Sequence, residues 1–429
     1  MDEQLILMTI SSNNTADEQL IAPAFLQNPY ATYRDLRQAE PVFWSEAWQS
    51  WLITRYDDSA KVLRDFRLFS SKGTITRYLD QLPRESLERV RPLYEHFSCG
   101  QVRLDPPEHT RVRAITAKTF TPGVIEKMRP RIEEIVSNLI DAALPNGKID
   151  LIAYFGAPLP GIVIADLFGF PREDRPRFKA WSDEIAAFHG TGSPNPDTVL
   201  KSQVALLEAR EWLSGLIADR RKSPRDDLLS RLANAEEEGT RLSEAQLFST
   251  CVTFMIGGHE TTTNLIGNGM YALLLHPGEA RRLAENPLQA VNAVEEMLRF
   301  DAPTQRAHRI AAEDIELRGQ TIHKGDFVQV VLGAANRDPD RFEEPDVFKI
   351  DRTDNRHVAF GVGPHFCPGA ALARLEAQIA IPELLRRLPG LRITQGAVVE
   401  FGPNNFFRGL KALPLEFDKG KSATSPNGA

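Results

Sequence analysis

The sequence has few cysteines and no long apolar run. Its three cysteines, Cys99, Cys251 and Cys367, form no CxxC pair and no even set, so a disulfide framework is not expected and a reducing compartment fits better. No apolar stretch reaches the roughly 18 residues that a membrane helix needs, and the acidic opening Met1–Leu5 is unlike a secretory signal. We therefore expect a cytoplasmic protein that does not span a membrane.

Clusters of positive charge are also missing. The 429 residues have a formal net charge of −7 and contain no basic run, which gives no reason to expect nucleic-acid binding. A hydrophobic fraction of 42% and a charged fraction of 25% are ordinary for a globular protein. We expect a flexible N-terminal arm over residues 1–27, one domain over residues 28–418 and a disordered tail over residues 419–429.

The periodicity predicts a mainly α protein with small β-sheets. Apolar residues recur at helical spacing in residues 125–144, 198–221, 244–275 and 283–299. Short strands are expected near the two ends, at residues 42–44, 51–54, 391–394, 398–401 and 413–417. No repeat period is present.

One cysteine lies in a glycine-rich loop that leads into a helix. The segment Phe360-Gly-Val-Gly-Pro-His-Phe-Cys-Pro-Gly369 places Cys367 where free N–H groups and the helix dipole favour a thiolate. Gly363 and Gly369 allow the backbone to approach a flat ligand, and His365 lies close enough to reach an anionic group at its edge. These are the parts of a haem-thiolate site. The alternative is an inert, buried cysteine beside a glycine turn.

The sequence marks both the start and the end of one long helix. Ser243 and Gln246 form a capping box, and helical character continues to Leu275, where a His-Pro-Gly sequence ends it. A helix of this length, about 48 Å, would cross the whole domain.

The middle of this helix contains two adjacent glycines. Gly257 and Gly258 each cost about 1 kcal/mol relative to alanine, so a function has to offset them. Without side chains here the helix has a groove, and Glu260 and Thr261 beside it are able to hold water or a diatomic ligand. The alternative is a packing notch for a crossing helix, with Glu260 in solvent.

Two pairs of charged residues have helical spacing. Glu296 and Arg299 lie three residues apart, which alone predicts only a weak surface ion pair. His109 and Arg113 lie four residues apart, so both point the same way and suit a ligand with carboxylates. The alternative for each is a solvated surface charge.

These motifs, in this order, resemble those of the cytochrome P-450 superfamily, from about Asn28 to Phe417. The resemblance implies the family fold, in which a long distal helix and a cysteine-ligand loop sandwich haem b. It implies the following roles: Cys367 as axial ligand of the iron; Phe360, Gly363, Gly369, Gly257 and Gly258 beside the haem; His109, Arg113, Arg309 and His365 on its propionates; Glu260 and Thr261 as the catalytic proton-delivery pair; and Glu296, Arg299 and Arg352 as a structural network.

The implied activity is that of a soluble, bacterial-type monooxygenase. It would insert one atom of dioxygen into a medium-sized, mainly apolar molecule by hydroxylation or epoxidation. Because the sequence contains no flavin or iron–sulfur segment, we expect electrons to come from a separate ferredoxin and its reductase, and ultimately from NAD(P)H. We also expect a monomer. The alternatives are a peroxide-driven oxygenase and a haem-thiolate sensor or isomerase that does not oxygenate.

Substrate-facing segments are placed only by the resemblance. The expected contacts are Phe188, Phe254, Gln305 and Phe406, although aromatic residues at such positions are equally consistent with a core. For the ferredoxin, Arg111, Lys118, Arg356 and Arg374 are expected to form a local positive patch on the cysteine side.

Overall fold

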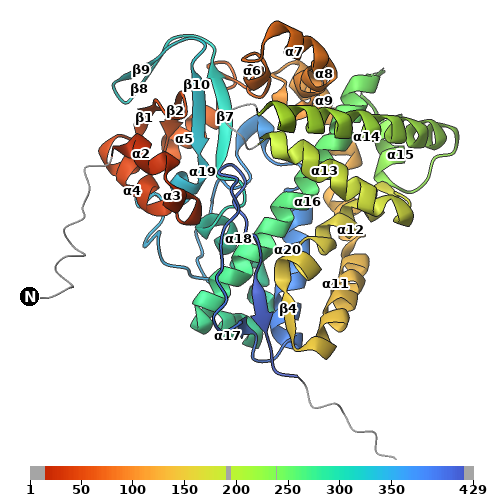
Figure 1. Ribbon diagram of the computed structural model, residues 1–429, viewed down its shortest axis with the longest axis vertical. Helices are drawn as coiled ribbons and strands as arrows, with labels where there is room; N and C mark the ends of the chain where they lie inside the picture. Colours follow the sequence, from red (N-terminus) through yellow and green to blue (C-terminus); the bar gives the residue numbers. More distant parts are fainter. Residues whose placement is uncertain (1–14, 190–194, 238, 420–429) are drawn as a thin grey trace, which may run out of the picture.

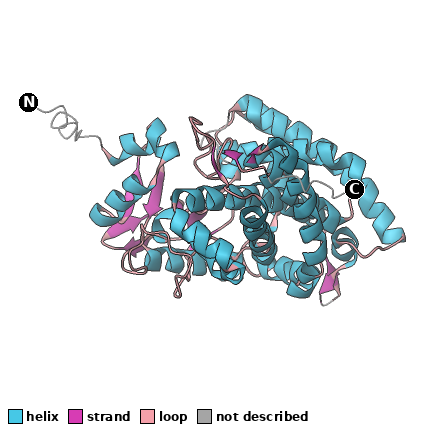
Figure 2. Cartoon of the chain, turned by 90° about the horizontal axis from the view of Figure 1, so that it is seen from below, coloured by secondary structure: helices cyan, strands magenta, loops and turns pink. Residues whose placement is uncertain are grey.

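A computed structural model describes residues 15–189, 195–237 and 239–419. The first 14 residues of the predicted arm, and all of the predicted tail except Lys419, lie outside this range. Figure 1 shows the strands of the larger sheet at one side beside the N-terminal helices, and a helical body at the other, with α16 running between them. The view in Figure 2 shows the same division, and the mainly α class with small sheets is confirmed.

The helices are α2 (Ala16–Ile21), α3 (Pro23–Gln27), α4 (Tyr30–Ala39), α5 (Tyr56–Arg64), α6 (Thr76–Leu79), α7 (Arg84–Arg89), α8 (Arg91–Cys99), α9 (Glu108–Thr119), α10 (Pro122–Glu126), α11 (Arg129–Ala143), α12 (Pro158–Phe168), α13 (Arg175–His189), α14 (Pro196–Lys222), α15 (Leu228–Asn234), α16 (Glu244–Leu275), α17 (Pro277–Glu285), α18 (Ala290–Phe300), α19 (Leu332–Ala335) and α20 (Ala370–Arg387). The strands are β1 (Val42–Ser45), β2 (Ser50–Ile53), β3 (Phe69–Ser70), β4 (Lys148–Asp150), β5 (Glu236–Glu237), β6 (Thr240–Arg241), β7 (Arg306–Ala311), β8 (Ile315–Leu317), β9 (Gln320–Ile322), β10 (Phe327–Val331), β11 (Arg392–Ile393) and β12 (Pro414–Glu416).

The prediction of a loose arm is wrong for residues 15–27. Thr15 and Glu18 form a capping box that starts α2, and α3 follows directly. Leu20 and Phe25 are buried in a small apolar cluster with α4 and the end of β10. Burial of Leu20 and Phe25 against one neighbouring cluster holds the segment in place.

Two sheets join distant parts of the chain. The larger has the strand order β1-β2-β10-β7-β3, with β10 parallel to β2 and its other pairs antiparallel. The smaller has the order β11-β12-β4, so the C-terminal strand pairs with residues 148–150. The strand expected at 398–401 does not form; Phe401 makes only an isolated bridge with Leu410.

Helix α16 is the central element, and its predicted bounds are confirmed. The Ser243 side chain accepts from the Gln246 N–H, and the Gln246 side chain accepts from the Ser243 N–H. Most residues of α16 are buried because it packs against α8, α12, α13, α18 and α20. The helix predicted at residues 198–221 is confirmed as α14. Two other predictions were less accurate, because residues 125–144 divide between α10 and α11, and residues 283–299 between α17 and α18. In the part of the chain that the structure describes, no helix has the length and apolar character for crossing a membrane.

Candidate active site

A cavity of about 270 Å³ lies between the loop that precedes α20 and the middle of α16. Cys367, Phe360 and His365 contribute to its wall from the loop, and Gly257 and Thr261 contribute from α16. The fold therefore brings together the two motifs that the sequence separates by about a hundred residues. Further wall residues come from β7, the segment before it and the C-terminal region: Thr304, Arg306, Ala307, His308, Arg309 and Phe406.

The Cys367 sulfur faces the cavity at the start of α20. The Cys367 N–H donates to the Phe360 carbonyl over 3.0 Å, which closes the loop. Burial raises the pKa of the Cys367 thiol, while the N–H groups of Gly369 and Ala370 donate to the sulfur and act in the opposite direction. The helix start thus supplies the donors that a thiolate ligand requires.

The glycines of the loop have different roles. Gly363 has a φ of +77°, and a Cβ there would lie 3.0 Å from the Arg64 Cα on α5. A side chain is therefore excluded by conformation and by space, but Gly363 is not part of the cavity wall. A Cβ at Gly369 would lie 3.8 Å from the Cys367 sulfur, which is an ordinary contact. The expected haem contact of Gly363 is thus replaced by packing on α5.

The four predicted propionate-binding side chains gather at one edge of the cavity. The rings of His109 and His365 are 4.2 Å apart, and the His365 Nε2 lies 3.1 Å from the Ser71 Oγ. Arg113, one turn after His109 on α9, donates to the Phe366 carbonyl over 2.9 Å. Arg309 reaches the same place from β7 and lines the cavity.

The basic side chains at this edge form no ion pair with an acidic side chain in the described part of the chain. Burial, together with the charges of Arg309, His109, Arg103 and Arg113, lowers the pKa of His365 to about 2. Burial also lowers the pKa of Arg309 to about 10, and the His109 Nε2 is buried without a hydrogen-bond partner. Buried cationic groups of this kind require anions that accept hydrogen bonds. The two carboxylates of a haem meet that requirement, so the residues present fit the group.

Only one of the two adjacent glycines of α16 faces the cavity. A Cβ built on Gly257 meets nothing within 4 Å, so this glycine leaves open space opposite Cys367. A Cβ on Gly258 would lie 3.1 Å from the Cδ1 of Ile164 on α12. Since successive residues of a helix point about 100° apart, Gly258 serves helix packing and leaves the predicted cofactor set.

The same rotation separates Glu260 from Thr261. The Thr261 hydroxyl lines the cavity and donates to the Gly257 carbonyl over 2.7 Å. Glu260 instead lines another cavity, of about 490 Å³, together with Asp183 of α13. Burial, and then the Asp183 charge, raise the pKa of Glu260 to about 7. The two residues are neighbours in sequence but face different spaces. His259 packs against α12 and contacts the Ala157 carbonyl.

Of the four expected substrate contacts, Phe406 alone reaches the cavity. Phe188 stacks on Phe97 at a ring distance of 5.4 Å, behind the cavity wall. Phe254 lies on another face of α16 and packs against Phe120. The Gln305 amide donates to the Ala302 carbonyl over 2.7 Å and is buried outside the wall. The facing of each side chain depends on packing that the sequence does not reveal.

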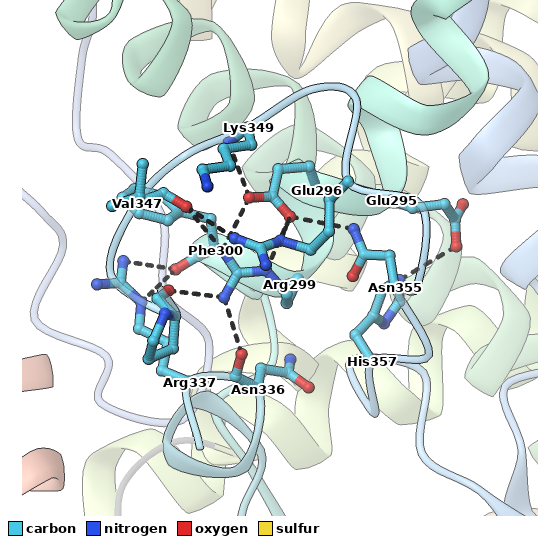
Figure 3. Close-up of polar contacts among 12 residues, drawn as sticks. Glu295, Glu296, Arg299, Phe300, Asn336, Arg337, Val347, Lys349, Asn355 and His357 are labelled. Atoms are coloured by element: carbon cyan, nitrogen blue, oxygen red, sulfur yellow. Dashed lines mark hydrogen bonds and ion pairs between the residues drawn. The ribbon is translucent and has the colours of Figure 1, made fainter. Parts of the chain in front are cut away.

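Glu296 and Arg299 form a buried ion pair (Figure 3). Arg352 joins Glu296 to complete a buried network. Arg299 binds both carboxylate oxygens of Glu296 at 2.8 Å, and the Arg352 Nε lies 3.0 Å from Oε2. Arg299 also donates to the carbonyls of Asn336, Pro345 and Val347. The Glu296 and Arg299 side chains are fully buried, so this is not the weak surface pair that the spacing alone predicts.

A neighbouring group escaped the sequence analysis. Glu295, beside Glu296, accepts both hydrogen bonds of Arg374 at 2.7 and 2.8 Å and contacts the His357 Nε2 at 3.2 Å. Burial alone would raise the pKa of Glu295, but these two partners overcome it and bring it to about 2. The Arg374 guanidinium also stacks 4.6 Å from the Phe360 ring. No spacing in the sequence marks this group, since its members join only in the folded chain.

Comparisons with known proteins agree with this geometry. The family model for cytochrome P-450 matches residues 84–390. The chain is 39% identical to the polyketide biosynthesis cytochrome P-450 PksS of Bacillus subtilis, over 92% of this chain and 97% of that protein. It is also 39% identical to the cytochrome P-450 monooxygenase PikC of Streptomyces venezuelae, over 97% of each.

A solved structure is similar over nearly the whole chain. P450BioI, in complex with an acyl carrier protein ligated to hexadec-9Z-enoic acid, superposes with a TM-score of 0.85 at 37% identity. The match covers 92% of this chain and 99% of P450BioI. The cysteine loop, the distal helix and the buried Glu-Arg-Arg network therefore belong together in a known architecture. The chain is a member of the cytochrome P-450 family, a haem-thiolate monooxygenase of the bacterial type.

Proposed function

We propose that this monooxygenase hydroxylates or epoxidises a medium-sized, mainly apolar organic molecule with electrons from a separate ferredoxin. The observation on which this rests is the single cavity that Cys367, Gly257 and Thr261 share. A second cavity of about 230 Å³ shares Val102, Arg103, Gly257, Thr304 and Phe406 with the first and extends to α8. Its other wall residues are mostly apolar, which suits such a substrate.

Haem bound by Cys367 supplies the redox chemistry, since a thiolate ligand favours O–O cleavage. The residues of the chain hold and orient the reactants. The N–H groups of Gly369 and Ala370 stabilise negative sulfur, and Arg113 and Arg309 hold the propionates in the proposed site. Gly257 keeps space free beside Thr261.

Proton transfer is assigned to Thr261 and Glu260 of α16. Thr261 holds a proton on Oγ1 at the cavity wall, where rotation of the hydroxyl redirects it from the Gly257 carbonyl to the cavity. With its pKa near 7, the Glu260 carboxyl exchanges protons at neutral pH in the cavity lined by Asp183. Protons would therefore pass through α16 from the Asp183 side to the Cys367 side.

The replacement of Thr261 with alanine tests this assignment. We expect Thr261→Ala to bind haem normally and to consume NADPH through ferredoxin and its reductase. Product formed per electron should fall about tenfold or more, with hydrogen peroxide in its place. Thr263→Ala is the matched control, since Thr263 makes the same type of bond, to the His259 carbonyl, but is buried away from the cavity. Unchanged coupling in Thr261→Ala would refute the role.

Three measurements separate the alternatives. A reduced carbon monoxide difference spectrum establishes the haem-thiolate state. Incorporation of labelled dioxygen into product, with ferredoxin and NADPH, establishes oxygenation, whereas turnover with peroxide alone would favour a peroxide-driven enzyme. Absence of both reactions across a substrate library would favour a sensor or isomerase.

The predicted ferredoxin patch requires revision. Arg374 is bound to Glu295 and is largely covered, and Lys118 pairs with Glu237. Arg111 binds the Gln246 side chain, and Arg356 remains highly exposed, 3.6 Å from Asp354. If the cysteine side docks the ferredoxin, Arg356 is the member of the predicted patch best placed to contact it.

A further inference from the structure

Three arginines beyond the predicted propionate clamps lie at or beside the cavity. Arg103 and Arg306 line it, and Arg77 lies next to them with its guanidinium 4.0 Å from the Phe327 ring. We call Arg77, Arg103 and Arg306 the arginine wall. His308, which also lines the cavity, stacks on the same Phe327 at 5.0 Å. Four basic side chains therefore converge at one side of this space.

The arginine wall has no acidic partner among the described residues. The ionisable neighbours of Arg306 are the phenols of Tyr33 and Tyr78, and burial raises the pKa of both, so they are neutral at neutral pH. Tyr78 also lies near Arg77 and Arg103, and Arg309 repels Arg103. Burial, and then the charges of these arginines, lower the pKa of His308 well below its usual range. Burial and the positive charges together keep His308 neutral.

Several donors of the group are also unused. Arg306 Nε, Arg103 Nε and His308 Nδ1 are buried without a hydrogen-bond partner in this structure. Arg306 is 5% exposed and His308 is 6% exposed. The guanidinium groups are held in place, since the Arg306 Nη2 donates to the Asn405 Oδ1 over 2.7 Å and the Arg103 Nη1 to the Thr74 Oγ1 over 3.0 Å. A buried cation with unused donors is costly unless an anion joins it.

The haem does not balance this charge. Its two propionates require two cations, and Arg113 and Arg309, assisted by His109 and His365, already provide them. Arg77 and Arg306 are therefore surplus to the haem, whereas Arg103, which adjoins Arg309 and His365, lies between the propionate edge and the rest of the arginine wall. Arg306 and His308 line the first cavity, and Arg103 lines both it and the second cavity. The second cavity is largely apolar, with a wall that includes Phe97, Val252, Ile256, Phe406 and Phe407.

We propose that the substrate of this enzyme is a carboxylic acid, with its carboxylate bound by Arg306, Arg103 and His308 and its apolar body in the second cavity. The proposal rests on the proposed monooxygenase function and names its substrate class. The planar guanidinium fork matches a carboxylate, and a neutral alcohol or ester would leave the charge of the arginine wall uncompensated. A cationic substrate would be repelled.

Paired acids and esters test the proposal on the haem-loaded enzyme. The probes are dodecanoic acid with methyl dodecanoate, and abietic acid with methyl abietate. Dissociation constants come from the low-to-high spin shift and from equilibrium dialysis, which needs no spectral change. We expect at least one acid to bind about tenfold or more tightly than its ester. Equal binding of acid and ester in both pairs, or no binding of either acid, would overturn the proposal.

Variants test whether Arg306 causes the preference for the acid over the ester. Arg306→Gln should reduce the preference for the acid to within about threefold while ester binding and haem content stay unchanged, and Arg306→Lys should retain part of it. Arg281→Gln, an exposed arginine on α17, is the control and should behave as the wild type. Loss of haem in Arg306→Gln, or equal loss of acid and ester binding, would instead make Arg306 a cofactor or structural residue. The monooxygenase function stands or falls separately, by the carbon monoxide spectrum and labelled-oxygen experiments.

Discussion

Two groups of arginines in this protein differ in their partners. In the network of Glu296, Arg299 and Arg352, the two oxygens of the Glu296 carboxylate accept from both arginines, and carbonyls accept most of the remaining guanidinium donors. In the arginine wall, Arg306 and Arg103 each donate to a single neutral oxygen, Arg77 contacts the Phe327 ring, and none of the three pairs with a carboxylate among the described residues. A buried charge with all its partners in the chain stabilises structure, whereas one that lacks them indicates a ligand.

The largest expected effect comes from breaking the complete network. Glu296→Gln removes the negative charge between two arginines and leaves them buried and uncompensated. We expect the free energy of unfolding in urea to fall by about 3 to 5 kcal/mol, with poor haem retention. Glu383→Gln on α20 is the control, because Glu383 and Arg386 have the same spacing but are partly exposed. That change should cost no more than about 1 kcal/mol. Similar losses in both variants would contradict the comparison.

A smaller effect is expected at Glu260, a buried carboxyl with another carboxylate as neighbour. Its pKa rises from 4.5 to about 7 on folding, so between these values the folded state holds more protons and stability falls as pH rises. The cost is absent below the unfolded pKa and complete above the folded pKa. Glu260→Gln should therefore gain about 2 kcal/mol over the wild type between pH 5 and pH 8. A pH-independent difference in the urea unfolding of the two haem-loaded proteins would contradict this.

The smallest change in stability is expected at Arg306, which has no carboxylate partner among the described residues. Arg306→Gln removes an uncompensated buried charge, and we expect the substrate-free enzyme to gain about 1 kcal/mol of stability. Stacking of Arg306 on Trp48, at 4.1 Å, opposes this gain and keeps it small. Arg281→Gln should change stability by less than about 0.5 kcal/mol. A loss of stability in Arg306→Gln would show that the arginine wall is structural, like the network.

The sequence predicts what local rules determine. The bounds of α16 follow from the capping box at Ser243 and the proline after His276, both of which act within a few residues. The loop around Cys367 could be identified because its turn-forming glycines and its reactive cysteine lie within the same ten residues. The segment at 398–401 has a strand-like pattern, but strands need ladder partners, and its neighbours pair elsewhere.

The facing of side chains could not be predicted in the same way. The sequence does not show which of Gly257 and Gly258, or of Glu260 and Thr261, faces the cavity. The packing of α12 on one side of α16 decides this. The arginine wall has no spacing motif, because Arg77, Arg103 and Arg306 come from three separate segments. Its signal is the absence of acidic neighbours, which exists only in the folded molecule.

The way in which the chain closes on itself determines when the cavity is complete. The Gln305 N–H donates to the Phe406 carbonyl over 2.9 Å, and the Arg408 N–H to the Pro303 carbonyl over 2.7 Å. Strand β12 then pairs with β4. During synthesis, the distal helix and the cysteine loop therefore leave the ribosome before this last wall exists. Phe406, which lines the cavity, thus comes from the part of the chain that is synthesised after both halves of the haem site.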